Sequence, residues 1–128
     1  VVMDCEMHYV LNIETGTINR YFGKIQINNN CWINQRAVIA KNTIIPGYSI
    51  VTRNSFLNKD YTQYGTNLLL SGSPAIPKNK KVQRVFDVLT ERDVGDFFRR
   101  NEEKIFVLKQ KGQINDDNNN SSIFNWQN

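Results

Sequence analysis

Large aliphatic side chains recur every six positions through the middle of the chain, at Ile27, Ile33, Ile39, Ile45 and Val51. A series of small residues follows four positions after each, at Cys31, Ala37, Thr43, Ser49 and Ser55. Polar and turn-forming residues stand between the two series, so each hexad predicts one short strand followed by a corner. Strands stacked about 4.8 Å apart, with the large and the small residue facing inward, indicate a β-helix.

The main alternative is an α/β domain with buried strands, because residues 37–40 and 43–45 also suit ordinary strands. The unbroken run of matches in both series favours the β-helix. A helical period fits poorly, since Asn28 to Asn30 and the pair Pro46-Gly47 interrupt any helical face.

Two segments depart from the repeat. Residues 9–24 contain the turn signal Glu14-Thr15-Gly16-Thr17, which predicts a loop or hairpin that projects from the coil before the hexads resume at Ile25. Beyond Phe56 the pattern degrades into a Leu68 to Leu70 strand, a turn at residues 71–74 and a basic connector at residues 78–84.

An amphipathic pattern follows the connector and predicts a helix from about Thr90 to Gln110, with Thr90 as its N-cap. Its apolar stripe comprises Val94, Phe97, Phe98 and Ile105. We therefore expect a β-helix domain over residues 1–85, with residues 9–24 inserted, and a helical extension over residues 86–111. The Asn-rich residues 112–128 predict a disordered tail.

Composition narrows the class of protein. A chain of 128 residues allows one domain, and 40% apolar with 22% charged residues is typical of globular proteins. The net charge of +4 is too small to indicate nucleic-acid binding, and no apolar stretch reaches the length of a membrane span. Two cysteines without a signal peptide predict reduced thiols and a cytoplasmic location. The opening at Val1 reads as the middle of a strand, so we expect upstream coils to be missing.

The hexads and their flanking motifs resemble the hexapeptide-repeat acyltransferases, and look closest to the sugar and capsule O-acetyltransferases of that family. Four family motifs have counterparts over residues 4–78. The family's Asp-x-Asp-x-His stretch corresponds to Asp4-Cys5-Glu6-Met7-His8, and its Ile-Gly-x-x-x-Trp-Ile-Gly to Ile27-Asn28-Asn29-Asn30-Cys31-Trp32-Ile33-Asn34. Its Thr-Lys-Asp corresponds to Asn58-Lys59-Asp60, and its Gly-x-Pro-Ala to Gly72-Ser73-Pro74-Ala75. The resemblance implies a left-handed parallel β-helix, an exception to right-handed crossovers, and the amphipathic pattern above adds a C-terminal α-helix. It also implies a homotrimer that binds acetyl-coenzyme A in clefts between subunits.

The sequence departs from the family at several positions. The family often has Gly after each large aliphatic, where this chain has Asn28, Asn34, Ala40, Pro46 and Thr52. We expect left-handed backbone there, which Asn tolerates at a higher cost than Gly. Asn34 also puts a side chain where the family leaves room for the thioester arm. Ile76 follows Pro-Ala where relatives often carry a cation.

His8 is the candidate catalytic base. A lone histidine is more often structural than catalytic, and the family motif is what favours catalysis. Transfer of acetyl to a hydroxyl needs a base that removes the hydroxyl proton, and imidazole titrates near neutral pH. Asp4 or Glu6 could hold the ring in the productive tautomer, or could simply be solvated.

Cofactor contacts follow from the same resemblance. Lys59, within the motif that includes Asn58, is the candidate phosphate ligand. Lys78, with Lys80, Lys81 and Arg84, forms a second basic group, which a solvated connector would equally explain. Backbone N–H groups around Asn34, Ala40 and Ser55 would face the pantetheine arm, and Pro74 would border it.

The acceptor is less well defined. Trp32 either lines the acceptor pocket or covers the coil edge, and the 9–24 loop would shape that pocket through Asn19, together with Asn12, Glu14 and Arg20.

The expected activity is transfer of acetyl from acetyl-coenzyme A to a hydroxyl of a sugar or glycan precursor, without a metal. Acetylation of serine or another small molecule is one alternative, and a truncated, non-catalytic β-helix module is another, suggested by the missing coils and Ile76. A zinc lyase on the same helix usually needs three histidine ligands, and the chain has one. Cys31 belongs to the inward series, so no acetyl-cysteine intermediate is expected.

Overall fold

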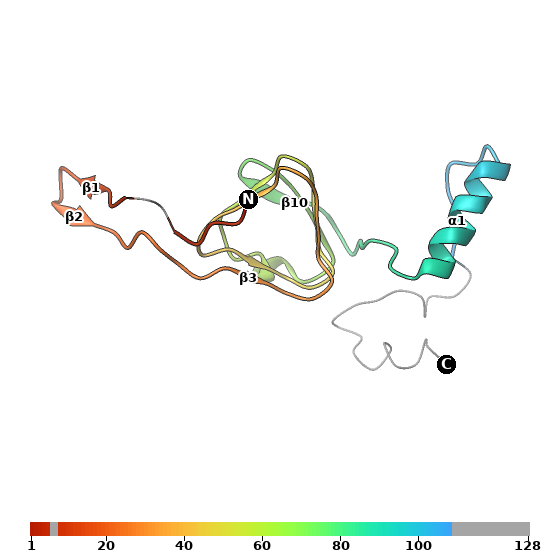
Figure 1. Cartoon of the computed structure of the whole chain (residues 1–128), viewed down its shortest axis with the longest axis horizontal. Helices are drawn as coiled ribbons and strands as arrows, with labels where there is room; N and C mark the ends of the chain where they lie inside the picture. Colours follow the sequence, from red (N-terminus) through yellow and green to blue (C-terminus); the bar gives the residue numbers. More distant parts are fainter. Residues whose placement is uncertain (6–7, 109–128) are drawn as a thin grey trace.

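A computed structural model describes residues 1–5 and 8–108 of the chain. These residues form short β-strands, one 3-10 turn and the helix α1 (Val88–Arg100). In Figure 1 the strands wind round a triangular coil, from which a hairpin projects on one side and α1 on the other. Within the described ranges, no helix has the length and apolar character needed to cross a membrane.

The coil contains six two-residue strands, one for each hexad: β3 (Gln26–Ile27), β4 (Trp32–Ile33), β5 (Val38–Ile39), β6 (Ile44–Ile45), β7 (Ile50–Val51) and β8 (Phe56–Leu57). They pair in parallel as β3 with β6, β4 with β7 and β5 with β8. Each pair joins residues 18 positions apart, as in Gln26 with Ile44. The chain therefore passes through three sheets before it returns to the first.

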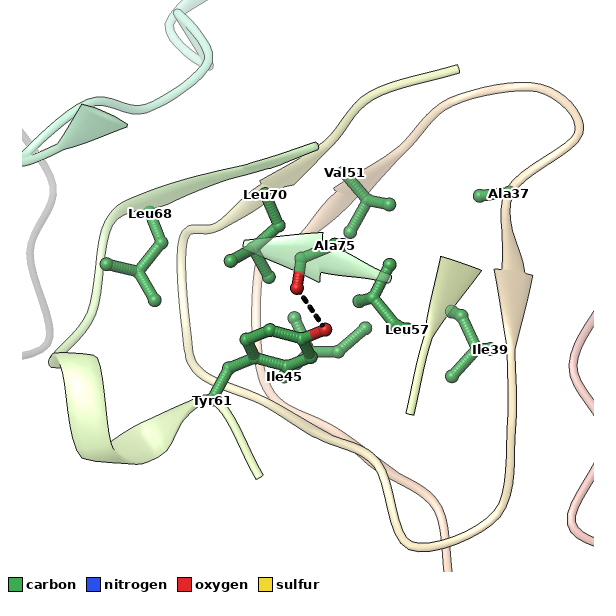
Figure 2. Close-up of a cluster of buried hydrophobic side chains, with 9 residues drawn as sticks. All are labelled: Ala37, Ile39, Ile45, Val51, Leu57, Tyr61, Leu68, Leu70 and Ala75. Atoms are coloured by element: carbon green, nitrogen blue, oxygen red, sulfur yellow. Dashed lines mark hydrogen bonds between the residues drawn. The ribbon is translucent and has the colours of Figure 1, made fainter. Parts of the chain in front are cut away.

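The inward series form the core. The large residues Ile39, Ile45, Val51 and Leu57 are fully buried, and Figure 2 shows their side chains converging inside the coil. The small residues Ala37, Thr43, Ser49 and Ser55 are also buried. Ile27 and Ile33 remain 40% and 36% exposed, because no described strand pairs with β3 or β4 on the upstream side. The hexad pattern thus predicts the core, except at the first two aliphatic positions.

Left-handed backbone also recurs every six residues, at Asn30, Arg36, Asn42, Tyr48 and Asn54, whose φ angles lie between 56° and 66°. The prediction that it would fall directly after each aliphatic, as at Asn28 and Asn34, was wrong. Those two side chains instead donate hydrogen bonds to the next coil, to the carbonyls of Ile45 at 2.9 Å and Val51 at 2.8 Å. The backbone there stays extended because it pairs with the neighbouring strand, and the turn comes two residues later.

The downstream end of the coil is closed by a hairpin and a buried tyrosine. The strand β9 (Leu68–Gly72) pairs in parallel with β7 and antiparallel with β10 (Ala75–Lys80). Tyr61 precedes the 3-10 turn η1 (Thr62–Tyr64) and is fully buried. Its hydroxyl donates a hydrogen bond of 2.8 Å to the carbonyl of Ala75, drawn in Figure 2. Tyr61 thereby ties η1 to the start of β10.

The predicted projecting hairpin is present as β1 (Leu11–Asn12) and β2 (Thr17–Ile18), which pair antiparallel. Gly16 between them has a φ of 70°, which glycine adopts without strain. Figure 1 shows the hairpin extending away from the coil.

The predicted helix exists but its limits differ. Its N-cap is Asp87 rather than Thr90, because the Asp87 carboxylate accepts from the backbone N–H groups of Leu89 and Thr90. The helix ends at Arg100, well before Gln110, since Asn101 is extended and donates to the Phe97 carbonyl. Ile105 therefore lies outside it. The predicted tail at residues 112–128 falls outside the described residues.

Candidate functional site

The three sheets of the coil give it three faces, which we number by their strands. Face 1 comprises β3, β6 and Asp60, face 2 comprises β4, β7, β9 and β10, and face 3 comprises β5, β8 and Val2, which pairs with Ile39. Because the side chains of one face share a sheet, these assignments decide which candidate residues one copy of the chain can bring together.

His8 stands at the base of the hairpin, after the segment that begins on face 3. The backbone N–H of Gly23 donates to the Asp4 carbonyl at 2.7 Å, and Cys5 pairs with Phe22, so the two sides of this base run antiparallel. His8 is exposed, and within the described ranges its imidazole has no hydrogen-bond partner. The ring is therefore accessible to a ligand.

Asp4 and Glu6 are the two carboxylates predicted to orient His8, and Asp4 is the one within the described residues. Asp4 lines a hollow of about 450 Å³ at the upstream end of the coil, together with Val2, Ile25 and Ile27. Glu6 lies outside the described residues. The orienting role of either residue stays a prediction.

Trp32 lies on face 2, beside the connector that leads to α1. The guanidinium of Arg84 sits 5.6 Å from the Trp32 ring and 5.6 Å from the Phe86 ring. Trp32 and Arg84 line a hollow of about 400 Å³ with Ile50 and Val94. The connector and the hairpin leave the coil on opposite sides in Figure 1. Trp32 belongs to face 2, whereas the segment that leads to His8 begins on face 3.

Lys59 lies next to face 1, at the start of the segment that leads into η1. Its ammonium is 5.6 Å from the Tyr61 ring and 5.7 Å from the Tyr64 ring, and the Lys80 ammonium is 5.9 Å from the Tyr64 ring. Two cations thus converge on one aromatic ring. Asp60 does not neutralise them by an ion pair in the described structure; it accepts from the Thr62 hydroxyl and N–H, and these bonds hold the pKa of the carboxyl below 3.8.

Asn58, Pro74 and Lys78 are exposed, the last two on the β9–β10 hairpin. Asn19 is exposed just after β2. These positions leave their side chains available, and their contacts with ligands stay predictions.

Two of the backbone N–H groups expected to face the thioester arm, those of Asn34 and Ala40, already donate hydrogen bonds within the coil. The N–H of Asn34 donates to Val51 at 3.0 Å and that of Ala40 donates to Leu57 at 2.9 Å. Ser55 is buried, where its hydroxyl shares a hydrogen bond with Thr52. In this conformation the two N–H groups hold adjacent coils together and do not point to a ligand.

An aromatic group at the base of the hairpin was missed by the sequence analysis. The rings of Tyr9 and Tyr21 lie 4.6 Å apart, those of Tyr21 and Phe22 lie 5.4 Å apart, and the Arg20 guanidinium lies 4.6 Å from the Phe22 ring. The available signal was the placement of aromatic residues at both ends of the predicted loop, directly beside His8.

Comparison with known proteins gives matches among solved structures. No protein-family model and no curated protein sequence matches the chain. The structure of the polySia-specific acetyltransferase NeuO matches with a TM-score of 0.60 and 14% identity, over 82% of this chain and 48% of that one. The polysialic acid O-acetyltransferase OatWY matches with a TM-score of 0.60 and 20% identity, over 75% and 47%.

The chain spans about half the length of each of these two proteins. At such identities the likeness establishes the fold. The resemblance to sugar O-acetyltransferases that the motifs predict is thereby confirmed in the architecture of the chain: it has the fold of polysialic acid O-acetyltransferases.

Proposed function

We propose that the chain transfers acetyl from acetyl-coenzyme A to a hydroxyl of a sugar or glycan precursor, on a left-handed parallel β-helix. The observation that carries this proposal is the shared fold with two polysialic acid O-acetyltransferases over three quarters or more of the chain. The accessible imidazole of His8 at the base of the hairpin supports it.

His8 acts as the base in the proposed reaction. Its imidazole takes the proton of the acceptor hydroxyl while the hydroxyl oxygen attacks the thioester carbonyl carbon. The new C–O bond forms and the C–S bond breaks, and His8 returns the proton to the departing thiolate. Asp4 or Glu6 fixes the tautomer of the ring in this scheme.

The donor's phosphates need cations, and the Lys59 and Lys80 ammoniums around Tyr64 fit that need. Asn58, Pro74 and Lys78 border the same end of the coil in the proposal, and the pantetheine arm follows the edge near Asn34, Ala40 and Ser55. Because the N–H groups of Asn34 and Ala40 are bonded within the coil, the arm contacts other atoms of this edge.

The site requires more than one copy of the chain in this proposal. His8, Trp32 and Lys59 belong to different parts of the coil, and a cyclic homotrimer brings different faces of neighbouring copies together at each contact. The acceptor then meets His8 and Asn19 of one copy and Trp32 of the next. The helix α1 (Val88–Arg100) packs outside the β-helix in this proposal, and use of acetyl-coenzyme A suits a cytoplasmic location.

Thiol release from acetyl-coenzyme A, measured with a panel of sugars and glycans, tests the activity. His8→Ala should lower turnover by about 10² to 10⁴ and leave donor affinity nearly unchanged, since a base acts in the chemical step. His8→Asn keeps much of the shape without the basicity and should behave alike. Near-normal turnover in both variants would overturn the role of His8.

Two other outcomes would replace the proposed function. Acetylation of serine with no sugar accepted would make the protein a serine acetyltransferase. Failure of the trimeric protein to bind acetyl-coenzyme A would favour a structural module, which has no need of the donor.

Mixing two inactive variants tests the shared site. If His8 and Trp32 act from neighbouring copies, the two variants His8→Ala and Trp32→Ala can be unfolded, mixed in equal amounts and reassembled. About a quarter of the sites should then combine an intact His8 from one subunit with an intact Trp32 from its neighbour. Each variant reassembled alone is the control. Activity no higher in the mixture than in the controls would contradict a site built from these two residues across the interface.

A further inference from the structure

The junction hollow, as we call the hollow of about 400 Å³ beside Trp32, lies where the coil, the connector and α1 meet. Its volume falls within the range of about 300 to 1,000 Å³ that small-molecule sites occupy. The coil contributes Trp32 and Ile50, the connector contributes residues 83–85, and α1 contributes Glu91 and Val94. Glu91 and Val94 are three positions apart and therefore share one face of the helix. The helix thus supplies one wall of a hollow that also contains a candidate acceptor residue.

The connector is held in place on both sides of Arg84. The side-chain amide of Asn67, a buried residue, donates to the side-chain oxygen of Gln83 at 3.2 Å. On the other side, the Phe86 ring lies 6.0 Å from the ring of Tyr48, which is buried in the coil. Arg84 is therefore positioned before a ligand arrives, which lowers the cost of ordering the site on binding.

Trp32 forms an aromatic wall of the junction hollow. Its side chain is 42% exposed, and no described strand pairs with β4 on the upstream side. The Arg84 guanidinium lies 5.6 Å from the Trp32 ring and 5.6 Å from the Phe86 ring, so one cation joins the two rings and holds the indole in place. Aromatic faces carry partial negative charge and attract the C–H groups on the flat side of a sugar ring. The wall therefore suits a sugar.

The two charged groups of the hollow, Arg84 and Glu91, have opposite signs but are not paired. Within residues 1–5 and 8–108, neither side chain makes an ion pair or a hydrogen bond. A guanidinium only donates hydrogen bonds and a carboxylate only accepts them, whereas a hydroxyl group does both. A ligand with adjacent hydroxyl groups therefore satisfies both side chains. A carboxylated ligand would bring a second negative charge beside Glu91, which like-charge repulsion disfavours.

We propose that the junction hollow binds an uncharged sugar unit of the acceptor. The sugar ring packs on Trp32, and its hydroxyl groups donate to the Glu91 carboxylate and accept from the Arg84 guanidinium. Glu91 is then a specificity-determining residue that α1 contributes to the acceptor site. This inference rests on the proposed acetyl transfer, because it gives the acceptor of that reaction a chemical class at this hollow.

The fluorescence of Trp32, measured without acetyl-coenzyme A, tests the inference. The chain has two tryptophans, so Trp126→Phe leaves Trp32 as the single one. The probes are methyl glycosides of uncharged hexoses and N-acetylhexosamines, with methyl sialoside as the carboxylated counterpart. We expect at least one uncharged glycoside to change the Trp32 emission saturably and to bind about tenfold more tightly than methyl sialoside, as one charged hydrogen bond provides. No response to any uncharged glycoside, or tighter binding of methyl sialoside, would overturn the inference.

Glu91→Gln, in the same background, tests the residue that sets the preference. It should weaken binding of the best uncharged glycoside about tenfold and narrow the preference over methyl sialoside, because a charged acceptor becomes a neutral one. Glu91 also stands in the first turn of α1, where its charge stabilises the helix. Loss of helix alone would weaken both probes alike, so an unchanged preference would refute the role of Glu91.

Glu103→Gln is the matched control for Glu91→Gln. It makes the same change of side chain at an exposed glutamate that does not line the junction hollow. Its affinities and its preference should equal those of the unmodified protein. A loss of preference as large as in Glu91→Gln would overturn the assignment, because it would show a general effect of charge.

The two proposals fail separately. Binding of an uncharged glycoside that depends on Glu91, without thiol release from acetyl-coenzyme A, would remove the acetyl transfer and keep a sugar site at the junction hollow. Thiol release with a sugar acceptor whose KM is the same in the unmodified protein and in Glu91→Gln would keep the enzyme and remove Glu91 from acceptor recognition.

Discussion

Tyr61→Phe removes one buried hydroxyl from the closed end of the coil and should destabilise the protein measurably. Tyr61 and Ala75 are both fully buried, and the hydroxyl donates to the Ala75 carbonyl at 2.8 Å. The ring remains in the variant, so packing against Leu57 and Leu70 changes little. The variant loses the hydrogen bond and leaves the buried Ala75 carbonyl without the hydroxyl that donates to it.

The expected cost follows from these two parts. A neutral hydrogen bond contributes about 1 kcal/mol net, and a buried acceptor left without a partner adds to the loss, which gives about 1 to 2 kcal/mol in the free energy of unfolding. With an ordinary dependence on urea for a chain of this size, the midpoint of unfolding should fall by about 0.5 to 1 M.

Urea titration followed by circular dichroism and tyrosine fluorescence measures this shift. Tyr64→Phe is the matched control, because Tyr64 packs beside Tyr61 but is only half-buried, and its hydroxyl makes no hydrogen bond among the described residues. Its midpoint should stay close to that of the unmodified protein. Equal shifts in the two variants, or no shift in Tyr61→Phe, would refute the assigned hydrogen bond.

The pH dependence of stability gives a second readout of the same residue. Burial raises the pKa of Tyr61 above 10.0. In the unfolded chain the phenol ionises near its ordinary pKa, whereas in the folded protein it must stay neutral to a higher pH. Its contribution is therefore complete below about pH 10 and is lost as pH rises through the folded pKa. The difference in the free energy of unfolding between the unmodified protein and Tyr61→Phe should therefore shrink as pH rises over that range.

Three further predictions concern the corners, the coil ladder and the helix. Arg36 has a φ of 61°, so Arg36→Gly should be neutral or stabilising in thermal unfolding, whereas Arg53→Gly, where φ is not positive, should cost about 0.5 to 1 kcal/mol. Asn34→Ala should cost about 1 kcal/mol in urea unfolding, because its side chain bonds to the Val51 carbonyl. The hydrogen bond from Thr90 lowers the pKa of Asp87 below 3.8, so Asp87→Ala should reduce helix content by circular dichroism at neutral pH, and the difference should vanish as pH falls through that pKa.

The core could be predicted from sequence because the coil repeats one steric demand. Each inward position must take a large aliphatic or a small residue. Ile39 and Ala37 in one hexad therefore indicate the same inward packing as Ile45 and Thr43 in the next. The corners were harder, because many residue types tolerate them. Asn30, Asn42 and Asn54 did carry a signal, since Asn accepts left-handed backbone, but Arg36 and Tyr48 interrupt it.

The start of α1 was predicted at the wrong residue because two good N-cap residues lie three positions apart. Both Asp87 and Thr90 are good N-cap residues and both precede the apolar stripe. The structure uses Asp87 as the cap, and the Thr90 hydroxyl donates to that carboxylate at 2.6 Å. Two N-cap candidates three residues apart thus act as a pair, which a search for a single cap residue does not anticipate.

The candidate site was hardest to predict, because a motif match transfers residue types without their distances. In a coil with an 18-residue turn, Trp32 shares face 2 with Ile50, while Lys59 runs beside Ile44 of face 1. His8 follows a segment that begins on face 3. His8, Trp32 and Lys59, which the motifs group into one predicted site, therefore lie on different faces of one copy of the chain. In the proposed cyclic homotrimer, unlike faces of neighbouring copies meet at every contact, so residues that one copy holds apart would come together between two copies.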